Sequence, residues 1–520
     1  MKRITERFFV LLFCALLFTG AAEAGNFTEL QDAISKTEAG GVLSLSGDYT
    51  YDLSADAGIS TEGIIIDKAI TIDGGGYAID AIGVVRIFKV IGNNVVFKNL
   101  TITKGGSAAS GGGVYVDQGM TVSFENVKVT KCGSEKGTHT RDGGAALFID
   151  SKANVTFTDC EISDNTGKDR AGGIYLKGNA VMRNTKITGN SSGSRGGGLY
   201  VDPGYAAPKR GGDWGGNVKM YDCLVMNNKG GRGGGIYVNT ENDKLNVFEN
   251  CTIAGNDVSS NRIGNGGGIL FYNAHAKLTN CTIIGNKARY GGGFILDVLS
   301  KLEITNCTMA GNTATESGAG LYAHDGSHSN DTMKAVGTAN FMGCVIVGNK
   351  LADGTAQDVS VHYSDNMDKD PNPELGPWVA RYDGNFVSGG YNVLGTADLT
   401  KPDGVSENVT ITLADSDVKN AAANEVLVYE GGIPALKDNG GFVPTAALAD
   451  KSAALDIIPA GTSWIPAADA RGVSRPQGLK ADAGAYEKQA DGGSSSGCSA
   501  APFPLLLLAL GGAAVFFRKR

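Results

Sequence analysis

The repeats of this 520-residue sequence lack the apolar spacing of amphipathic helices, and charged residues make up only 19% of the chain. Glycine is abundant, with 77 residues, but it follows no fixed triplet. Both features suit a turn-rich β-protein better than a helical or a disordered chain.

Basic residues are also scarce outside the two ends of the chain. Of the 46 basic and 54 acidic residues, six basic and two acidic ones lie in residues 1–24 and 498–520, so residues 25–497 carry a net charge of -12. Such a surface argues against nucleic acid as a partner.

The nine cysteines include no Cys-x-x-Cys pair, the spacing that usually binds zinc. Six of them occupy one position of an internal repeat, where Leu100, Val127 and Thr185 stand in other copies. These six are Cys160, Cys223, Cys251, Cys281, Cys307 and Cys344. Because a buried thiol behaves as a small hydrophobe, we expect a column of free, inward-pointing thiols, with no metal and no cofactor. Neighbouring thiols could oxidise if the protein is exported.

The internal repeat dominates residues 111–349. Each copy opens with small residues and an apolar pair, as in Gly196-Gly-Gly-Leu-Tyr200, and closes with an apolar-x-x-Asn pattern, as in Asn280-Cys-Thr-Ile-Ile-Gly-Asn286. Successive copies start 33, 27, 25, 37, 33, 25 and 27 residues apart, a period typical of solenoids. Apolar residues alternate within each copy, as in a strand that is half buried on one face. Since one copy cannot bury that face alone, the copies must stack, and we predict an all-β, right-handed parallel β-helix.

The asparagines that close the copies form a second regular feature. Asparagine tolerates the left-handed conformation and can hydrogen-bond the backbone at a turn. When the copies stack in register, these side chains predict a ladder of hydrogen-bonded amides. The ladder would consist of Asn165, Asn190, Asn228, Asn256, Asn286, Asn312 and Asn349.

The repeats resemble those of two known groups of proteins. Gly-Gly-Ala-Ile-like and Phe-x-x-Asn-like motifs are typical of the passenger repeats of polymorphic outer membrane proteins, which are surface-displayed β-helices associated with adhesion. Here glycine replaces most of the alanines, and only Ala145, Ala146 and Ala319 approach that pattern. Similar repeats occur in pectin-lyase-like enzymes, so the fold does not decide the activity.

The N-terminal region has the features of an export signal. Residues 1–24 combine three basic residues, an apolar run and the small residues Ala22 and Ala24. This pattern predicts a secretory signal peptide that is cut between Ala24 and Gly25.

A short helix is expected after the signal peptide. Residues 26–35 carry an apolar stripe, and Thr28 and Gln31 have the spacing of a capping box. We expect this helix to cap the open first coil of a β-helix that spans residues 25–350.

Residues 351–488 resemble the choice-of-anchor Q domain. Its landmarks occur in order as Gly389-Gly-Tyr-Asn-Val-Leu-Gly395, Asp438-Asn-Gly-Gly-Phe-Val-Pro-Thr445 and Asp482-Ala-Gly-Ala-Tyr-Glu487. In that family the segment follows a β-helix and precedes one of several alternative surface anchors. The resemblance therefore implies that these residues complete the β-helix. We expect Arg471 and Arg475 to pair with Asp469, Asp482 or Glu487 in a structural network.

The chain ends in a linker, an apolar segment and a basic tail. Residues 489–499 hold the linker and a Gly-Cys-Ser motif that resembles the Synergist-type C-terminal sorting signal. The resemblance implies cleavage near Gly497 or Cys498 by a rhomboid-like sorting protease. Residues 500–520 predict a transmembrane helix with a cytoplasmic basic end. We expect the export machinery and that protease as partners, and the processed protein at the cell surface or outer membrane; a permanent membrane anchor is the alternative.

No catalytic motif stands out in the repeats. They contain no Asp-Asp pair, and neither Gly-His-Gly nor Arg-Ile-Lys of the polygalacturonase type. Arg170, Arg195 and Arg232 each stand three residues before the same repeat glycine, so stacking predicts a column of like charges on one exposed edge. These charges need counterions. The candidates are the acidic groups of an anionic glycan or the side chains of Asp164, Asp169 and Asp202.

We therefore expect a cell-surface adhesin, or a protein that binds glycans or extracellular matrix, without catalytic activity. A polysaccharide lyase or glycoside hydrolase on the same fold is the first alternative. An enzyme of this kind would place two carboxylates beside a basic residue in a groove. A structural spacer without a ligand is the second alternative.

Overall fold

The computed structural model describes most of the chain between Gly25 and Gln489. The described residues are 25–106, 110–134, 143–202, 215–240, 244–262, 264–297, 300–324, 337–362, 385–396 and 410–489. The predicted signal peptide with Ala24, the predicted sorting motif with Gly497 and Cys498, and the apolar segment 500–520 lie outside them. No helix within these ranges is long and apolar enough to cross a membrane.

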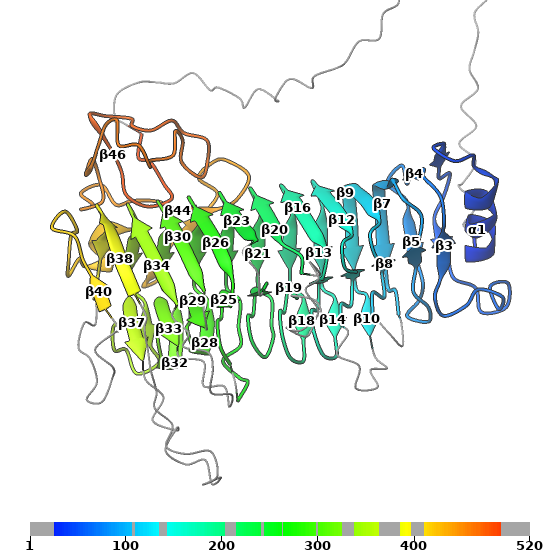
Figure 1. Ribbon diagram of the computed structural model, residues 1–520, viewed down its shortest axis with the longest axis horizontal. Coiled ribbons are helices and arrows are strands. Elements are labelled where there is room, and N and C mark those ends of the chain that lie inside the picture. The colour runs from blue at the N-terminus through cyan, green and yellow to red at the C-terminus, as the bar shows by residue number, and fades with distance from the viewer. Residues whose placement is uncertain are drawn as a thin grey trace, which may run out of the picture. The chain divides into compact units, whose positions relative to one another are not determined.

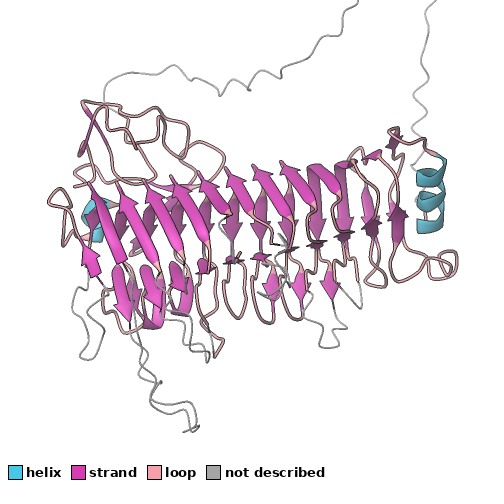
Figure 2. Ribbon diagram, in the orientation of Figure 1, coloured by secondary structure: helices cyan, strands magenta, loops and turns pink. Residues whose placement is uncertain are grey.

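Stacked coils build the body of the protein, and each full coil adds strands to two long parallel sheets (Figures 1 and 2). Successive coils pair in register, so Leu147 lies between Val114 of the preceding coil and Ile174 of the next. Such pairing places equivalent side chains in columns along the stack. The sequence prediction of a parallel β-helix is therefore confirmed.

The first sheet, called sheet B here, takes one strand from each coil. Its strands are β3 (Ile64–Ile66), β6 (Phe88–Val90), β8 (Val114–Val116), β11 (Leu147–Ile149), β15 (Ile174–Leu176), β19 (Leu199–Val201), β22 (Ile236–Asn239), β25 (Ile269–Tyr272), β29 (Phe294–Asp297), β33 (Leu321–His324) and β37 (Val359–His362).

The second sheet, called sheet A, takes two strands from most coils and bends sharply between them. Its strands are β1 (Val42–Ser44), β2 (Tyr49–Thr50), β4 (Ile70–Asp73), β5 (Ala78–Asp80), β7 (Val95–Thr103), β9 (Thr121–Thr130), β12 (Asn154–Thr158), β13 (Glu161–Ser163), β16 (Asn179–Arg183), β17 (Lys186–Thr188), β20 (Val218–Tyr221), β21 (Leu224–Met226), β23 (Leu245–Glu249), β24 (Thr252–Ala254), β26 (His275–Thr279), β27 (Thr282–Ile284), β30 (Lys301–Thr305), β31 (Thr308–Ala310), β34 (Thr338–Met342), β35 (Val345–Val347), β38 (Asn385–Gly390), β39 (Val393–Leu394) and β40 (Thr410–Thr412).

Two short parallel sheets lie where the coils turn from sheet A back to sheet B. One contains β10 (Gly133–Ser134), β14 (Thr166–Gly167) and β18 (Ser191–Ser192). The other contains β28 (Lys287–Tyr290), β32 (Thr313–Ser317) and β36 (Lys350–Leu351).

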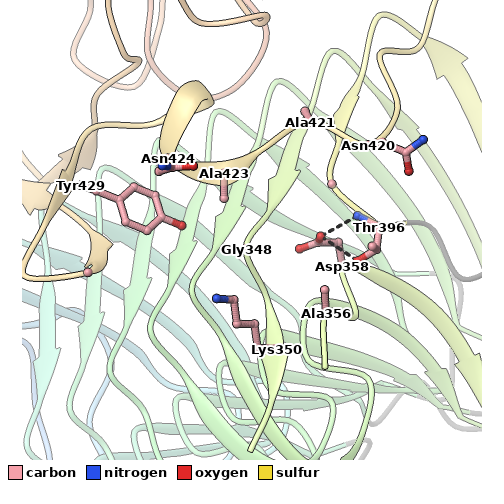
Figure 3. A pocket seen from close by; sticks show the side chains of 12 residues that line it. Gly348, Lys350, Ala356, Asp358, Thr396, Asn420, Ala421, Ala423, Asn424 and Tyr429 are labelled. Carbon is pink, nitrogen blue, oxygen red and sulfur yellow. Dashed lines mark hydrogen bonds between the residues drawn. The ribbon is translucent and has the colours of Figure 1, made fainter. Parts of the chain in front are cut away.

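The asparagine ladder predicted from the repeat is confirmed at this turn. Each side-chain amide donates to the Oδ1 of the next asparagine at 2.8 to 3.0 Å, from Asn165 through to Asn349. The ladder ends on Asp358, which accepts from the Asn349 amide at 2.8 Å. Asp358 also accepts from the Thr396 hydroxyl at 3.1 Å (Figure 3). Because all these asparagines are buried, the ladder satisfies polar groups that water cannot reach.

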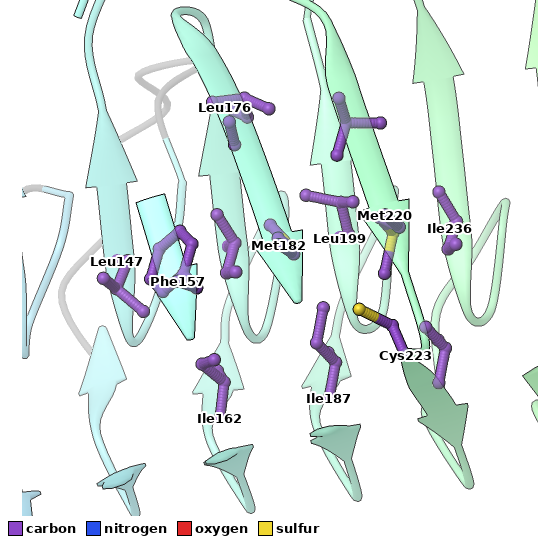
Figure 4. Close-up of a cluster of buried hydrophobic side chains, with 14 of the residues drawn as sticks. Leu147, Phe157, Ile162, Leu176, Met182, Ile187, Leu199, Met220, Cys223 and Ile236 are labelled. Atoms are coloured by element: carbon purple, nitrogen blue, oxygen red, sulfur yellow. The ribbon is translucent and has the colours of Figure 1, made fainter. Parts of the chain in front are cut away.

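Alternate apolar side chains fill the interior of the coils. Figure 4 shows part of this interior, with Leu147 from sheet B and Ile162, Met182, Ile187 and Met220 from sheet A. The six cysteines of the column are buried there as free thiols, as predicted. Burial raises the pKa of the Cys344 thiol to about 12, so this thiol stays protonated at neutral pH.

Helix α1 (Phe27–Lys36) covers the open end of the first coil, as predicted. Phe27, Leu30 and Ile34 form its buried face. The Gln31 side chain accepts from the Ile65 N–H at 2.8 Å and donates to the Ile65 carbonyl at 3.1 Å. Gln31 therefore pairs with the backbone of the first strand of sheet B, which would otherwise present an open edge.

The capping box of this helix differs from the prediction. Asn26 caps the helix, and the Glu29 carboxylate accepts from the Asn26 N–H at 3.0 Å. Thr28 lies inside the first turn because the helix begins at Phe27, and its hydroxyl donates to Asp56 at 2.7 Å. The assignment of the box to Thr28 and Gln31 was therefore wrong.

Residues 427–489 add no coil to the described stack and instead cover the outer face of sheet A (Figure 1). Their apolar side chains, including Leu448 and Ile458, pack on Ile284 and Val345 of the coils. The short elements near the C-terminus are α2 (Ala423–Val426), β41 (Tyr429–Glu430), β42 (Ile433–Pro434), β43 (Leu436–Lys437), β44 (Thr445–Ala446), β45 (Ile458–Pro459) and β46 (Lys480–Ala481).

A buried network of charges holds this C-terminal segment together. Arg471 pairs with Asp469 at 2.7 Å, and Arg475 pairs with Glu487 at 3.0 Å. Arg475 also donates to the Asp482 carbonyl at 2.6 Å. The predicted structural pairing of the two arginines is confirmed.

Candidate functional site

The arginine column predicted from the repeat exists in the structure. Arg170 bridges to Arg195, and Arg195 bridges to Arg232, through parallel backbone pairing. All three side chains are only partly exposed. The expectation of an exposed edge is therefore met only in part. The Arg170 guanidinium lies over the Tyr200 ring at 5.5 Å, and that of Arg195 lies over the Tyr237 ring.

The aromatic row lies on the outer face of sheet B. Ring centroids of successive residues are 4.9 to 5.1 Å apart. The rings belong to Tyr115, Phe148, Tyr175, Tyr200 and Tyr237. The last four residues are no more than 2% exposed, so their ring faces are closed to a ligand. We conclude that this row stabilises the stack.

Arg170 is neutralised within the protein. Its guanidinium pairs with Asp202 at 3.3 Å, and only 11% and 4% of the two side chains are exposed. Asp202 also accepts a hydrogen bond from the Tyr175 hydroxyl. Of the counterions considered from the sequence, Asp202 is the one that Arg170 uses.

Arg195 and Arg232 make no ion pair with any residue in the described ranges. Arg195 hydrogen-bonds the Tyr200 hydroxyl and stacks over the Tyr237 ring at 5.6 Å. Two cations on adjacent coils therefore remain along this edge, about one strand spacing of 4.8 Å apart.

A groove of about 410 Å³ lies on the opposite side of the coils, along the bend of sheet A. We call it the open groove. Its first row, the bend row, contains Asn99, Asn126, Asp159 and Asn184. Its second row, the outer row, contains Thr101, Lys128, Glu161 and Lys186. Every side chain of both rows is at least partly exposed.

The bend row exists because the chain must turn there with a left-handed residue. Asn126 has a φ of 52° and Asp159 a φ of 55°, a conformation that Asn and Asp tolerate better than most residues. The bend row residues bind one another, since Asn126 donates to Asn99 at 2.9 Å and Asn184 donates to Asp159. Their remaining polar atoms face the groove.

The outer row alternates in charge. Glu161 is paired by strand register with Lys128 on one side and Lys186 on the other. Lys128 makes an ion pair with Glu161 at 2.8 Å. Burial opposes ionisation of Glu161, but hydrogen bonds from Lys128 and Ser163 outweigh it and lower the pKa of this carboxyl. Glu161 is therefore a carboxylate at neutral pH.

The same two rows continue under residues 427–489, where they are occupied. The Thr252 hydroxyl donates to the Pro444 carbonyl at 2.6 Å, and the Asn280 amide donates to the Ala468 carbonyl at 2.8 Å. The Asn306 amide donates to the Asp482 carbonyl at 3.2 Å. The rows thus hold carbonyl oxygens of a covering chain in one half of the molecule and stay open in the other.

Asp222 lies in the bend row where the open half meets the covered half. Burial raises the pKa of its carboxyl, against a hydrogen bond from Asn250 and the charge of Arg183. Arg183 stacks over the Tyr221 ring at 4.4 Å. Asp159 and Asp222 are separated by one intervening coil, which puts their backbones about 10 Å apart, or two strand spacings.

The sequence contains a signal for both rows that the repeat pattern alone does not reveal. Each residue of the inward column, such as Cys160, is preceded by a bend row residue and followed by an outer row residue. The Asn-Cys-Thr motifs follow the same rule in the covered half. Only when the coils are stacked do the flanking side chains point outward and form the two rows of the groove.

The predicted processing positions are placed only in part. Gly25 is described, and its N–H donates to the Asp48 carbonyl at 2.8 Å in the first coil. Ala24, Gly497 and Cys498 lie outside the described residues. Within the part of the chain that the structure describes, no group of three or more His, Cys, Asp or Glu side chains could hold a metal ion.

Coils, columns and the bent sheet define a right-handed parallel β-helix protein. The model of the family described as "right handed beta helix region" matches residues 87–262 and 232–369, which together exceed half of the chain. The chain therefore belongs to this family.

Two enzymes are among the similar solved structures. The pectate lyase Pel9A is 14% identical, with 88% of this chain and 90% of that chain covered and a TM-score of 0.36. The periplasmic alginate epimerase AlgG is 11% identical, with 67% and 84% covered and a TM-score of 0.33. No curated protein matches the sequence. At these values the likenesses carry no conclusion about activity.

Proposed function

We propose that this protein is exported, displayed at the cell surface and binds an acidic glycan along the open groove without cleaving it. The observation that carries the proposal is the change between the two halves of the groove rows. In the covered half, Thr252 and Asn280 hold carbonyl oxygens of residues 427–489. In the open half the equivalent positions are exposed, and we assign them to a ligand that presents oxygen atoms at regular spacing.

The charges of the open half favour a glycan over a second peptide segment. Under residues 427–489 the outer row is uncharged, with Thr252, Thr282 and Thr308, and apolar residues beside it pack against the covering chain. In the open half the outer row carries Lys128, Glu161 and Lys186 instead. A hydrated, polar polymer suits these groups because they keep water or hydroxyl contacts.

The groove holds two lysines and the two carboxylates of Asp159 and Glu161, so the assignment of acidic groups to the glycan rests on the lysine that has no ion pair. Lys128 is paired with Glu161, whereas Lys186 makes no ion pair within the described ranges. Lys186 therefore supplies the free cation of the groove. Arg195 and Arg232 offer two further cations on the far side of the coils, and we propose them as a secondary contact for the same acidic polymer.

Asp159 and Glu161 place two carboxylates beside Lys128 in the groove, the arrangement expected of an enzyme, so the argument for binding without cleavage rests on the protonation state of Glu161. Hydrolysis of a glycosidic bond needs a protonated carboxyl beside a carboxylate. Hydrogen bonds lower the pKa of Glu161, so it does not hold a proton at neutral pH.

The proposal is tested with the full-length chain in detergent solution. We expect retention on immobilised heparin or polygalacturonate and none on neutral dextran, with release by salt. The double variant Lys128→Gln/Lys186→Gln should lose at least about tenfold in affinity. Lys277→Gln, which removes an exposed lysine outside the groove, is the matched control. Equal retention of the double variant and the control would refute the groove as the binding site.

A second function, glycoside hydrolysis, is favoured by one observation. Burial raises the pKa of Asp222, so this carboxyl is suited to hold a proton. Asp159 lies in the same bend row, and one coil separates it from Asp222. Inverting hydrolases separate their carboxyls by about 6.5 to 9.5 Å. Release of reducing ends from polygalacturonate or heparin, abolished in Asp222→Asn and in Asp159→Asn, would establish hydrolysis; intact polymer after incubation would exclude it for these substrates.

A further inference from the structure

A second cavity lies over the last coils and shares no lining residue with the open groove. Its volume is about 600 Å³, within the range of small-molecule sites. Four separate segments of the chain line it, around residues 348–358, 395–396, 420–424 and 429–432. The coils supply the first two segments, and the turn into the C-terminal cover supplies the others (Figure 3).

Glycine leaves the floor of this cavity open. Gly348 has a φ of 69°, and a Cβ there would lie 2.6 Å from the Tyr429 hydroxyl and 2.8 Å from the Ala423 side chain. A Cβ on Gly395 would overlap the Asp358 carboxylate. A larger residue at either position would therefore push against the walls, so the cavity depends on these two glycines.

Three polar groups converge on the cavity. The Lys350 ammonium and the Tyr429 hydroxyl lie on one side of Gly348, and Thr396 lies with Asp358 on the other (Figure 3). Lys350 is exposed and makes no ion pair with a residue in the described ranges. The Lys350 ammonium is thus a cation at the cavity with no counterion among the residues that the structure describes.

Asp358 is not available to a ligand, although it lies in the wall. It is 1% exposed, and its two oxygens accept from the N–H and amide of Asn349 and from the N–H and hydroxyl of Thr396. These four bonds fill its acceptor sites. Because Thr396 donates its hydroxyl proton to Asp358, its oxygen is left to accept a hydrogen bond from the cavity.

We propose that this cavity binds an acidic sugar, either as a free monosaccharide or as the end of a glycan. The sugar carboxylate would bind the Lys350 ammonium and the Tyr429 hydroxyl, since both groups donate and one is charged. Sugar hydroxyls would donate to the Thr396 oxygen and to the amide oxygens of Asn420 and Asn424. This site goes beyond the groove proposal and does not depend on it.

Calorimetric titration of the full-length protein in detergent tests the proposal. The ligands are glucuronic acid and galacturonic acid, with glucose and galactose as neutral counterparts, and an oligosaccharide that ends in glucuronic acid. We expect both acids to bind at least about tenfold more tightly than the neutral sugars. A stronger signal for the oligosaccharide than for the free acid identifies a glycan end as the ligand, and the reverse identifies the monosaccharide.

Variants assign the binding to the cavity. Lys350→Gln, an exposed substitution that leaves the fold intact, should remove the preference for acids, and Tyr429→Phe should weaken acid binding severalfold. Lys301→Gln, on an exposed face of sheet A, is the control. Equal binding of acidic and neutral sugars, no binding of either acid, or unchanged binding in Lys350→Gln would each overturn the proposal. The double variant Lys128→Gln/Lys186→Gln, which should lose groove binding, is expected to bind the sugar acids in this cavity as the unaltered protein does.

Discussion

Arg170 and Asp202 lie on adjacent coils and pair at 3.3 Å, with only 11% and 4% of their side chains exposed. This ion pair explains how the arginines of successive coils can lie next to one another in the stack. Arg170 has its own carboxylate, so it repels Arg195 less than an unpaired guanidinium would. The arginine column therefore divides into one structural member and two members that face solvent in part.

Removing the Arg170 charge should destabilise the protein. In Arg170→Met, the buried Asp202 loses its ion pair with the Arg170 guanidinium, and we expect the free energy of unfolding to fall by about 3 kcal/mol. Arg232→Met removes a side chain without a described ion pair and should cost less than about 1 kcal/mol. Urea unfolding followed by circular dichroism measures both variants. Equal losses would show that the Arg170 pair adds no stability.

The cysteine column should tolerate an apolar substitution and reject a charged one. Cys281 is 0% exposed, so Cys281→Asp buries a carboxylate without a cation and should cost more than about 3 kcal/mol. Cys281→Ala removes one buried atom and should cost about 1 kcal/mol. Thermal melting compares the two variants with the unaltered protein. Similar melting temperatures for both variants would mean that the thiol does not face the core.

Asp358 should make stability rise as the pH falls. Burial raises its pKa above the usual 3.8, so the folded protein binds a proton at this group more tightly than the unfolded chain. The free energy of unfolding therefore increases as the pH drops from 7 through the folded pKa, and levels off near 3.8. We expect Asp358→Asn to lose this component, whereas Asp415→Asn, at an exposed position, keeps it.

Melting temperatures between pH 7 and pH 4.5 measure this difference. Other groups change little among the three proteins, so the comparison isolates Asp358. An identical pH dependence in the unaltered protein and in Asp358→Asn would contradict the assignment.

Much of the fold follows from the sequence because its determinants are local and repeated. The alternation of apolar residues, the recurring Asn256 and Asn286 and the cysteine positions each predict a column once the period is known, and stacking brings them together. The open groove could not be predicted from these repeated positions alone. Its rows are formed by residues such as Asp159 and Glu161, which look like ordinary polar residues until the bend turns them outward.

The cavity at the last coils was beyond prediction for a different reason. Lys350, Thr396 and Tyr429 are far apart in the chain, and only Lys350 stands at a repeat position, directly after Asn349, so no spacing connects the three. Their approach depends on how residues 427–489 pack on sheet A, which a resemblance to a domain family does not specify. The same packing decides which half of the groove is open.

Processing at both ends is predicted from the sequence alone. The exported chain should begin at Gly25, whose N–H already donates to Asp48 in the first coil. It should end near Gly497 or Cys498 if a rhomboid-like protease removes the apolar segment. Intact-mass analysis of protein released from the cell surface measures both ends. A C-terminus that still carries Phe516 to Arg520 would indicate a permanent membrane anchor instead.

Protection of lysines by a bound polysaccharide tests the central claim most directly. The full-length protein is acetylated with and without heparin or polygalacturonate, and the modified lysines are quantified by mass spectrometry. If an acidic glycan lies in the open groove, Lys128 and Lys186 should be protected, while Lys277 and Lys301 react equally in both samples. Equal modification of Lys128 and Lys186 with and without a polysaccharide that the protein retains would contradict the account.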